Sequence, residues 1–524
     1  MRLICTTAAV GILARLFIIW TGWAEGGLIA DDAYYYFKIA SNMAAGDGST
    51  FDGLAPTNGY HPLWLWVLVP VFQIFGGSLW LPVKLALTLS TLFDLTTGVL
   101  LLLILRNLGY ERGAWVAILF WFLSPFTLLL GLRGMEASLS AMLVMSVFWH
   151  LSVLVGKSQN PGVREGLLTS LLLGLAGLAR IDNLAVLGLA LVLFAVILPQ
   201  ASPLIRREAT MRWLGVVAFG SVVVVLPWFW WNLTTFDSLI PVSGLVKNEF
   251  DIYGRIEFDW HSIKSVARSL TNATVGPIFH AARFASLEEF SSARLTHLAT
   301  LGMTAGVLVT LYRSRKELLQ DLLLKPAGAL LLAGSAFMAG HVVLMSVIWR
   351  AYINWYALPY LSLYALLLGV LCSGMMRSSK TRRMIPVSLL TLVSVFCLIL
   401  YGRFFTGIEL GPALGEHHNR TRFEALANAY PQGVCAGAFN AGLLGYAASG
   451  FGNITVINLD CRVNNVAFAA AKEGRLSQYI IEHVDVLLEP PGSGYFLFQP
   501  GELQELESSY TAWPDRLLWS RDQM

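Results

Sequence analysis

Charged residues are scarce in this sequence. Asp, Glu, Lys and Arg make up only 13% of its 524 residues, whereas a typical soluble protein has about 25%. Hydrophobic residues account for 56% of the chain, and the mean hydropathy is +0.62. The shortage of charge excludes an ordinary soluble globular protein. Repeated apolar runs long enough to cross a bilayer instead predict a polytopic α-helical membrane protein.

Signals for several other protein classes are absent. Lys and Arg form no basic tract of the kind that binds nucleic acid, so no nucleic-acid partner is expected. The net charge of +3 gives no information about other partners. The five cysteines show no CxxC motif and no metal-ligand spacing. Only Cys435 and Cys461 lie outside the apolar region, and a disulfide between them is left open.

Eleven apolar segments are expected to span the membrane, and a twelfth candidate, 63–78, is short. Segment 3–21 resembles the apolar core of a signal peptide, but it is longer, contains Arg15 and has no obvious cleavage site after it. We therefore expect a retained helix. The other ten segments are 81–105, 114–130, 137–156, 166–180, 183–199, 214–231, 298–312, 326–348, 356–372 and 385–401.

Loop charge decides how the chain is threaded. Five short loops are rich in Lys and Arg, and they share one side of the membrane only if 63–78 does not fully cross it. We therefore predict a re-entrant or interfacial helix at 63–78, a cytoplasmic N-terminus and an outer C-terminus. The polar connections on the outer face are then 22–80, 131–136, 179–182, 232–297 and 349–356.

The chain after residue 401 changes character. The stretches "GVCAGAF", "NITVINL", "VDVLLEP" and "GYFLF" have the pattern of short strands, and helical patterns lie between them. Alternating strands and helices predict a small α/β domain. We therefore divide the chain into a membrane module, 1–401, and an extracytoplasmic α/β domain, 402–524.

Two adjacent aspartates stand out in the first outer loop, in "IADDAYYYFKIASNM". From Ala33 onward the apolar residues follow a helical period that ends at Gly46, a plausible C′ glycine. Asp31 and Asp32 therefore stand at a helix start, where a carboxylate caps free backbone N–H groups and gains from the helix dipole. One residue suffices for a cap, so the second carboxylate calls for a partner or a use.

The stretch "DDAYYYFKIA…GDGSTFDG…TNGYHPLW" resembles the first outer loop of the GT-C membrane glycosyltransferases. That superfamily includes protein O-mannosyltransferases, lipid A aminoarabinose transferases, arabinofuranosyltransferases and the oligosaccharyltransferase catalytic subunit. The resemblance extends over the first seven spans, the long outer loop and "NAGLLGYAASG…ITVINLDCRVNN". It implies a GT-C bundle of about 11 spans, in the inner (cell) membrane of a bacterium or archaeon with the active face outward.

The resemblance also implies a reaction. The expected enzyme moves a sugar, hexose or pentose, from a polyprenyl-phosphate donor to a hydroxyl of a lipid, glycan or protein acceptor. Asp31 is expected as the general base and Asp32 as its neighbour in binding or orientation. Inversion is expected, although a retaining route with a carboxylate nucleophile stays open. No metal cofactor is expected.

Candidate substrate-binding residues on the outer face each have a structural alternative. Arg133 and Glu136 form either an interfacial ion pair in a turn or a site in which Glu136 faces the acidic pair. Arg180 and Asp182 form either a solvated helix-end pair or part of the lining of the active site. In either case, both pairs of residues place charge at the membrane edge, beside the loop that carries Asp31 and Asp32.

Five further candidates come from aromatic and basic positions. Lys247 lies either on an interfacial helix or against the lipid phosphate. Arg350 and Tyr356 are either interface anchors or phosphate-binding groups, and arginine suits phosphate through bidentate geometry. Tyr60 and His61 precede the short helix; a metal site at His61 is disfavoured because no second histidine stands at ligand spacing.

Asp94 lies deep within a predicted span, where an ionised carboxylate is expensive. It is expected to face the bundle interior and to form an interhelical hydrogen bond. Arg15 either snorkels to the interface or pairs with Asp94.

A transporter or flippase of a lipid-linked saccharide is the main rival to a glycosyltransferase. Such a protein typically shows repeated halves and polar groups near the middle of the membrane. Here no repeat is visible, and the ionisable residues gather at one face. A non-catalytic saccharide-binding protein would leave the paired aspartates unexplained.

Overall fold

The computed structural model describes most of the chain. Two of the predicted spans, 298–312 and 385–401, lie outside the described residues, as do the loop from 251 to 297 and Arg350. The residues that the structure describes are 2–21, 28–157, 159–250, 325–345, 354–377, 414–499, 501–512 and 518–521.

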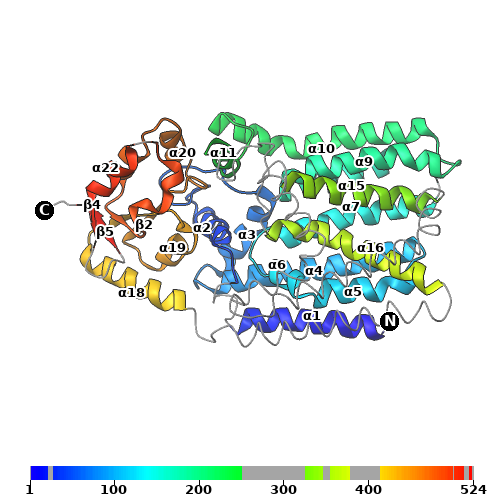
Figure 1. The fold of residues 1–524 in the computed structure, drawn as a ribbon, viewed down its shortest axis with the longest axis horizontal. Helices are drawn as coiled ribbons and strands as arrows, with labels where there is room; N and C mark the ends of the chain where they lie inside the picture. The colour runs from blue at the N-terminus through cyan, green and yellow to red at the C-terminus, as the bar shows by residue number, and fades with distance from the viewer. Residues whose placement is uncertain are drawn as a thin grey trace, which may run out of the picture.

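Long apolar helices form a bundle of roughly parallel rods (Figure 1). Among the described residues, six helices are long and apolar enough to cross a membrane. Helix α3 (Pro62–Phe75) has only 14 residues and is about 21 Å long, shorter than the roughly 30 Å of a hydrocarbon core. This length agrees with the prediction that 63–78 does not fully cross. The six long helices are α1 (Arg2–Trp20), α4 (Leu81–Asn107), α7 (Ala137–Lys157), α9 (Asp182–Ala201), α10 (Arg207–Phe236) and α15 (Pro326–Val343), with α8 (Val163–Ala179) and α16 (Leu358–Arg377) packed among them.

The segment predicted as one span at 114–130 is broken into two helices, α5 (Ala114–Leu123) and α6 (Pro125–Gly131). Proline disfavours a helical conformation in the residue before it, and Ser124 is accordingly extended, with φ −66° and ψ 123°. Pro125 then starts the new helix, where its missing N–H costs nothing. The Thr127 hydroxyl donates to the carbonyl oxygens of Trp121 and Ser124, and so links the two helices across the break.

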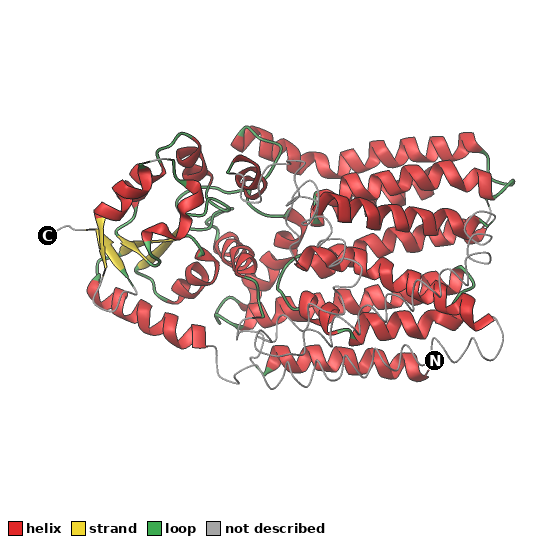
Figure 2. Cartoon of the chain, viewed as in Figure 1, coloured by secondary structure: helices red, strands yellow, loops and turns green. Residues whose placement is uncertain are grey.

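A mixed sheet lies at the other end of the molecule (Figure 2). Its strand order is β2-β1-β3-β5-β4, with β1 parallel to both β2 and β3, and β5 antiparallel to β3 and β4. Val434 of β1 stands opposite Ile454 of β2. The strands are β1 (Val434–Ala438), β2 (Ile454–Asn458), β3 (Val486–Leu487), β4 (Tyr510–Ala512) and β5 (Trp519–Arg521), and the surrounding helices are α18 (Leu414–Ala429), α19 (Ala441–Ala447), α20 (Asn465–Lys472), α21 (Leu476–His483) and α22 (Glu502–Ser509).

Two expectations for this C-terminal region are corrected. The strand predicted at "GYFLF" is wrong, because residues Pro491–Leu497 form a 3-10 helix, η6. Pro491 stands in its first turn, where proline favours helical backbone over a strand. The disulfide that was left open is also absent, since Cys435 and Cys461 are both free thiols.

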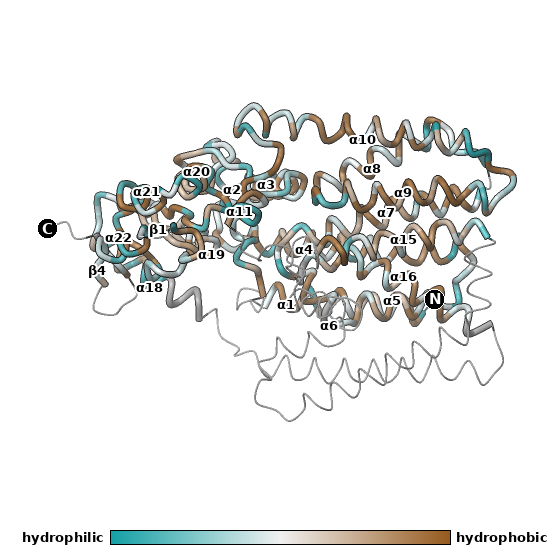
Figure 3. Tube along the Cα trace, turned by 45° about the horizontal axis from the view of Figure 1, so that its top comes forward, coloured by the Kyte–Doolittle hydropathy of each residue, from teal (hydrophilic) through white to brown (hydrophobic). Residues whose placement is uncertain are grey.

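Hydropathy separates the two ends of the molecule (Figure 3). The bundle helices are predominantly hydrophobic along their length, and hydrophilic residues gather where α9 leads into α10. Large apolar side chains such as Phe219 and Leu189 are exposed on the outside of the bundle, at 75% and 60%. In a membrane, lipid covers such side chains, so this outer surface is that of an integral membrane protein.

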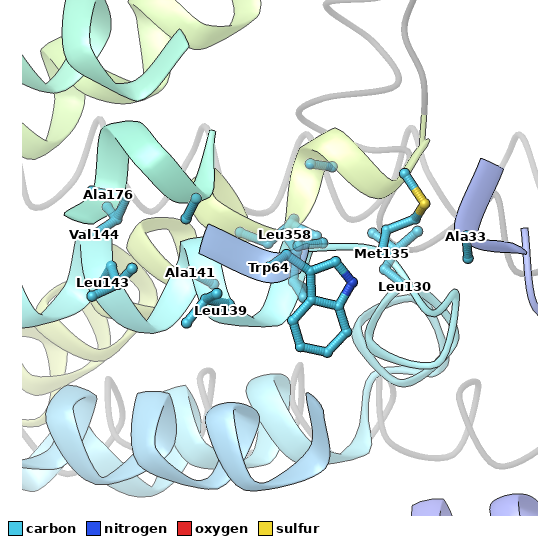
Figure 4. Packing of buried hydrophobic residues seen from close by; sticks show 14 of the residues in the cluster. Ala33, Trp64, Leu130, Met135, Leu139, Ala141, Leu143, Val144, Ala176 and Leu358 are labelled. Atoms are coloured by element: carbon cyan, nitrogen blue, oxygen red, sulfur yellow. The ribbon is translucent and has the colours of Figure 1, made fainter. Parts of the chain in front are cut away.

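The bundle and α3 share one apolar core. Trp64 of α3 is fully buried, and Figure 4 shows it close to Leu139, Leu358 and Met135. Its indole Nε1 donates to the carbonyl oxygen of Gly134 at 3.1 Å, so the polar edge of the ring is satisfied. Helix α3 is thereby inserted beside the chain that leads into α7, and it is not loosely attached.

A buried ion pair joins α1 to α4. The Nε atom of Arg15 lies 3.4 Å from Asp94 Oδ2, and neither side chain is exposed by more than 1%. Arg15 Nη1 also donates to the carbonyl oxygens of Gly11 and Phe122, each at 3.1 Å. Of the two alternatives for Arg15, the structure therefore shows pairing with Asp94. The pair neutralises two charges that apolar surroundings would penalise heavily.

Breaking this pair should destabilise the bundle. Arg15→Met leaves the Asp94 carboxylate buried without its cation, and we expect a loss of about 3–5 kcal/mol in the free energy of unfolding. Adding Asp94→Leu should recover most of that loss, because both charges are then gone. Arg2→Met, an exposed change on the same helix, is the control. Thermal and denaturant unfolding in detergent measures all four proteins, and a double variant no more stable than Arg15→Met would contradict the role of the pair.

Candidate active site

The acidic pair opens α2 (Asp31–Ala45) but does not cap it. Ala30 is the N-cap residue and makes no side-chain cap, so the alternative in which an aspartate caps its own helix is wrong. The Ala30 N–H donates to the Arg133 carbonyl oxygen at 3.0 Å, which fixes the helix start one residue before the pair. Gly46 ends α2 with φ 96°, as the C′ glycine prediction required.

Asp31 binds a different helix, α19 of the C-terminal region. Its carboxylate accepts the backbone N–H of Gly442 at 3.1 Å and that of Leu443 at 2.9 Å, one on each oxygen. These are free N–H groups of the first turn of α19, which follows β1. The approach is so close that a Cβ atom at Gly442 would collide with the Asp31 carbonyl oxygen. Asp31 therefore acts as a cap supplied from more than 400 residues away.

Burial raises the pKa of Asp31 to about 6. The hydrogen bond from Leu443 opposes this rise, and the neighbouring charge of Asp32 adds to it. Gly442 opposes it further, whereas the charge of Asp460 adds to it. At neutral pH the carboxylate is thus mostly ionised, but only because the two N–H groups offset the cost of burying it.

Asp32 has a different partner. Its Oδ1 lies 2.9 Å from Nη1 of Arg462, and the two side chains are 23% and 26% exposed. Arg462 Nε lies 3.4 Å from Oδ2 of Asp460. Among the described residues, no hydrogen bond or ion pair reaches Asp32 Oδ2. Asp32 is thus a partly exposed side chain bonded through one oxygen, whereas both oxygens of Asp31 accept hydrogen bonds.

Asp460 is buried at the end of β2 and collects three donors. It accepts the Tyr35 hydroxyl at 3.0 Å, Asn458 Nδ2 at 2.8 Å and the Arg462 N–H at 2.9 Å. Asn458 Nδ2 also lies 3.2 Å from the Tyr35 hydroxyl oxygen. This network ties α2 to the carboxyl end of β2. Sequence reasoning missed these residues, although charged side chains directly after a predicted parallel strand were the available signal.

A second cluster lies at the edge of the bundle, around Arg180. Arg180 donates to Glu136 at 2.7 Å and, through two nitrogens, to both oxygens of Asp182 at 3.1 and 3.2 Å. Tyr36 also donates to Glu136, at 3.2 Å. All four side chains are buried. The expected solvated pair at 180 and 182 is therefore a buried bidentate pair, and the surroundings are apolar enough to favour its full neutralisation.

Glu136 makes no ion pair with Arg133 and no hydrogen bond with either aspartate of the acidic pair. Arg133 Nη1 instead donates to the Leu28 carbonyl oxygen at 3.2 Å. The ion-pair alternative for Arg133 and Glu136 is therefore wrong, and the alternative in which Glu136 faces the acidic pair stays a prediction. The reason is geometric: the connector turns through Gly134, at φ 77°, and Glu136 lies beyond this turn, where it meets Arg180 from the next helix pair.

Tyr356 joins two cations. It lies on the short helix η4 (Asn354–Ala357), and the guanidinium of Arg180 is 3.9 Å from its ring centroid. Its hydroxyl accepts Lys247 Nζ at 3.1 Å, and Lys247 comes from α11 (Val242–Glu249). His341 Nε2 donates to the Tyr356 carbonyl oxygen at 2.8 Å. Lys247 and Tyr356, both predicted from sequence, are thus brought together beside Arg180.

His61 reaches this cluster and Tyr60 does not. The His61 N–H donates to the Tyr36 hydroxyl oxygen at 3.1 Å, and its Nε2 lies 3.9 Å from Glu136 Oε1. Burial lowers the pKa of His61, although Glu136 favours the protonated ring. The Tyr60 hydroxyl instead shares a 2.5 Å hydrogen bond with Ser49, and its ring packs on Trp228. Tyr60 therefore shapes the loop and is placed away from the Arg180 cluster.

Helix α2 connects the two clusters through consecutive tyrosines. Tyr35 binds Asp460 on the C-terminal side, and Tyr36 binds Glu136 on the bundle side. Within the described ranges, no three His, Cys, Asp or Glu side chains are placed to hold a metal ion. The expectation of a metal-independent reaction stays a prediction.

Comparison with known proteins identifies the fold. No protein-family model and no curated protein sequence matches the chain. Among solved structures, the archaeal oligosaccharyltransferase AglB from Archaeoglobus fulgidus, in complex with an inhibitory peptide and a dolichol-phosphate, is 12% identical, with a TM-score of 0.59 over 99% of this chain and 74% of that one. A structure of the Archaeoglobus fulgidus oligosaccharyltransferase tethered to an acceptor peptide with the NVT sequon gives 13% identity, a TM-score of 0.59 and the same coverage.

ArnT from Cupriavidus metallidurans, bound to undecaprenyl phosphate, is 15% identical, with a TM-score of 0.51 over 88% of this chain and 87% of that one. AglB and ArnT are both GT-C proteins. At these identities the likeness shows the fold, and the predicted GT-C fold is confirmed.

The raised pKa of Asp31 predicts a pH dependence of stability. The folded protein holds this proton more tightly than the unfolded chain, so the contribution of Asp31 to stability falls as the pH rises from about 4 to about 6. Relative to Asp31→Asn, the wild-type protein should lose up to about 3 kcal/mol across this window. Denaturant unfolding in detergent at several pH values measures the difference, with the exposed Glu424→Gln as control. Parallel profiles for wild type and Asp31→Asn would contradict the shift.

Proposed function

We propose that this chain is an inverting glycosyltransferase that moves a sugar from a polyprenyl-phosphate donor to a hydroxyl of a lipid, glycan or protein acceptor. The reaction takes place at the outer face of the cell membrane, with residues 1–401 as the membrane module and 402–524 as an extracytoplasmic domain. The observation that carries the proposal is the acidic pair at the start of α2, in which the partly exposed Asp32 side chain pairs with Arg462 through one oxygen. The shared GT-C fold supports the choice of donor.

The acidic pair supplies the general base. The base removes the proton from the acceptor hydroxyl, the acceptor oxygen bonds to the anomeric carbon, and the bond from that carbon to the phosphate oxygen breaks. Polyprenyl phosphate leaves with the electron pair. A single displacement of this kind inverts the anomeric centre, and it needs one carboxylate, without a second as nucleophile.

The contacts favour Asp32 over Asp31 as the base. A base needs a lone pair that faces the acceptor, and Asp32 Oδ2 has no polar partner among the described residues. Both oxygens of Asp31 accept backbone N–H groups. The sequence-based preference for Asp31 stays a prediction, and in our proposal Asp31 holds the loop on α19 instead.

The cluster at the edge of the bundle binds the donor phosphate. Arg180 is occupied by Glu136 and Asp182, so it contributes mainly by orienting the Tyr356 ring. Lys247, which donates to the Tyr356 hydroxyl, and His61 lie at the same edge. A developing phosphate charge is stabilised by such cationic or hydrogen-bonding groups. Arg350, also predicted for this role, lies outside the described residues.

A flippase of a lipid-linked saccharide is the weaker alternative. The buried Arg15 and Asp94 neutralise each other, and Arg15 Nη1 is also held by two backbone carbonyl oxygens, so the pair has a structural explanation without a transport path. The other charged clusters lie at one end of the bundle. The structural neighbours are also glycosyltransferases.

Substitution of each aspartate tests the assignment of the base. We expect Asp32→Asn to lower the transfer rate by about 100- to 10,000-fold, because the amide cannot accept the acceptor proton. Asp31→Asn should keep measurable transfer but unfold at a lower temperature. The assay measures transfer from polyprenyl-phosphate-linked hexoses and pentoses to a membrane extract, with folding checked by gel filtration. Full activity of Asp32→Asn together with an inactive Asp31→Asn would return the base to Asp31.

Substitution of Lys247 tests the phosphate site. Lys247→Gln removes one charge-assisted hydrogen bond, and we expect binding of undecaprenyl phosphate to weaken by about 10-fold or more. Tyr356→Phe, which removes only the hydroxyl that Lys247 reaches, should change the affinity less. Titration calorimetry in detergent measures both. An unchanged affinity for Lys247→Gln would place the phosphate elsewhere.

A further inference from the structure

A short turn after β2 faces the acidic pair. It contains Asp460, Cys461 and Arg462, and Cys461 has a left-handed backbone with φ 65°. Asn464 Nδ2 donates to the Asn458 carbonyl oxygen at 3.0 Å and closes the turn from the far side. The turn is therefore a rigid structure whose shape does not depend on Asp32.

The first outer loop packs directly on this turn. A Cβ atom at Gly59 would collide with the Arg462 carbonyl oxygen, so only glycine allows this approach. One residue earlier, the buried Asn58 accepts the Val242 N–H and Asn465 Nδ2, each at 3.1 Å. The loop that carries the acidic pair, the start of α11 and the start of α20 thus meet at one point.

Arg462 stands between two carboxylates of different parts of the chain. Its Nη1 is 2.9 Å from Asp32 Oδ1, and its Nε is 3.4 Å from Asp460 Oδ2. Asp460 is itself held by Tyr35 and Asn458. The buried network around Asp460 therefore orients the Arg462 guanidinium, which presents Nη1 to Asp32. A planar, always charged guanidinium suits such a double contact.

We propose that Arg462 is a positioning residue for the acidic pair, which orients the Asp32 carboxylate so that its second oxygen faces the acceptor hydroxyl. This inference rests on the proposed function. It gives the C-terminal region a part in the chemistry, because the turn after β2 supplies the cation that pairs with Asp32.

Charge balance explains why such a residue is required. Among the described residues, the charge of Asp32 acts on both Asp31 and Asp460, and Arg462 contacts Asp32 and Asp460. Without Arg462, the Asp32 carboxylate would lose its ion-pair partner beside two other carboxylates. In general, loss of a contacting cation favours the protonated form of a carboxylate, and a protonated carboxyl group cannot act as a base.

The test is the pH dependence of transfer by the full-length protein. Arg462→Gln should move the acidic limb of the kcat/KM profile to higher pH by about one unit, because the carboxylate then protonates more easily. Arg462→Lys should reverse part of this shift, since lysine keeps the positive charge but lacks the planar set of N–H donors that lets arginine contact both carboxylates. Arg420→Gln, which removes an exposed arginine from the pair with Glu424, should leave the profile in place. A merely structural role would reduce the amount of active protein without moving the limb.

A double-mutant cycle provides a readout that does not need activity. The melting temperatures of Asp32→Asn, Arg462→Gln and the double variant should be non-additive, with the double variant less destabilised than the sum. Additive effects, or an acidic limb that does not move in Arg462→Gln, would overturn the proposal. If the wild-type protein transfers no sugar from any donor tested, the proposed function fails, and additivity or coupling in the cycle still decides whether Arg462 holds Asp32.

Discussion

Two adjacent carboxylates stand at the start of one helix, and the structure satisfies them with separate partners. Asp31 takes the free N–H groups of α19, and Asp32 takes the guanidinium of Arg462. Both partners belong to the C-terminal region. The position of that region against α2 is therefore the arrangement that allows two negative charges to stand side by side, partly buried, at the edge of an apolar bundle.

The same principle of neutralisation operates on the bundle side, with the signs reversed. There the single cation Arg180 is enclosed by Glu136 and Asp182, and its flat face rests on Tyr356. Because Arg180 already contacts two carboxylates and one ring, its main role is to hold these neighbours in place. Lys247, which donates to the hydroxyl of the same tyrosine, has the flexible stem and point charge that suit a phosphate.

The sequence predicted the features that depend on local pattern. The helical period from Ala33 to Gly46 gave α2 nearly its observed bounds, and the pairing of Arg180 with Asp182 is a contact between residues two apart. The partners of the acidic pair could not be predicted in this way, because Asp31 and Leu443 are 412 residues apart and Asp32 and Arg462 are 430 apart. No periodicity carries over such a distance. The wrong prediction of a strand at "GYFLF" has a local cause: the apolar, aromatic run is typical of a strand, but Pro491 in the first turn favours the 3-10 helix that forms.

Helix α2 determines how the network around Asp460 and the cluster around Arg180 are placed relative to each other. Consecutive residues of a helix point about 100° apart, and Tyr35 and Tyr36 use that angle to reach Asp460 on one side and Glu136 on the other. A rotation of α2 that improved one contact would break the other. The acidic pair and the Arg180 cluster are thus held at a fixed separation by one rigid element of 15 residues. In the proposed reaction, the acceptor and the donor would meet at the start of α2, where Asp32 stands.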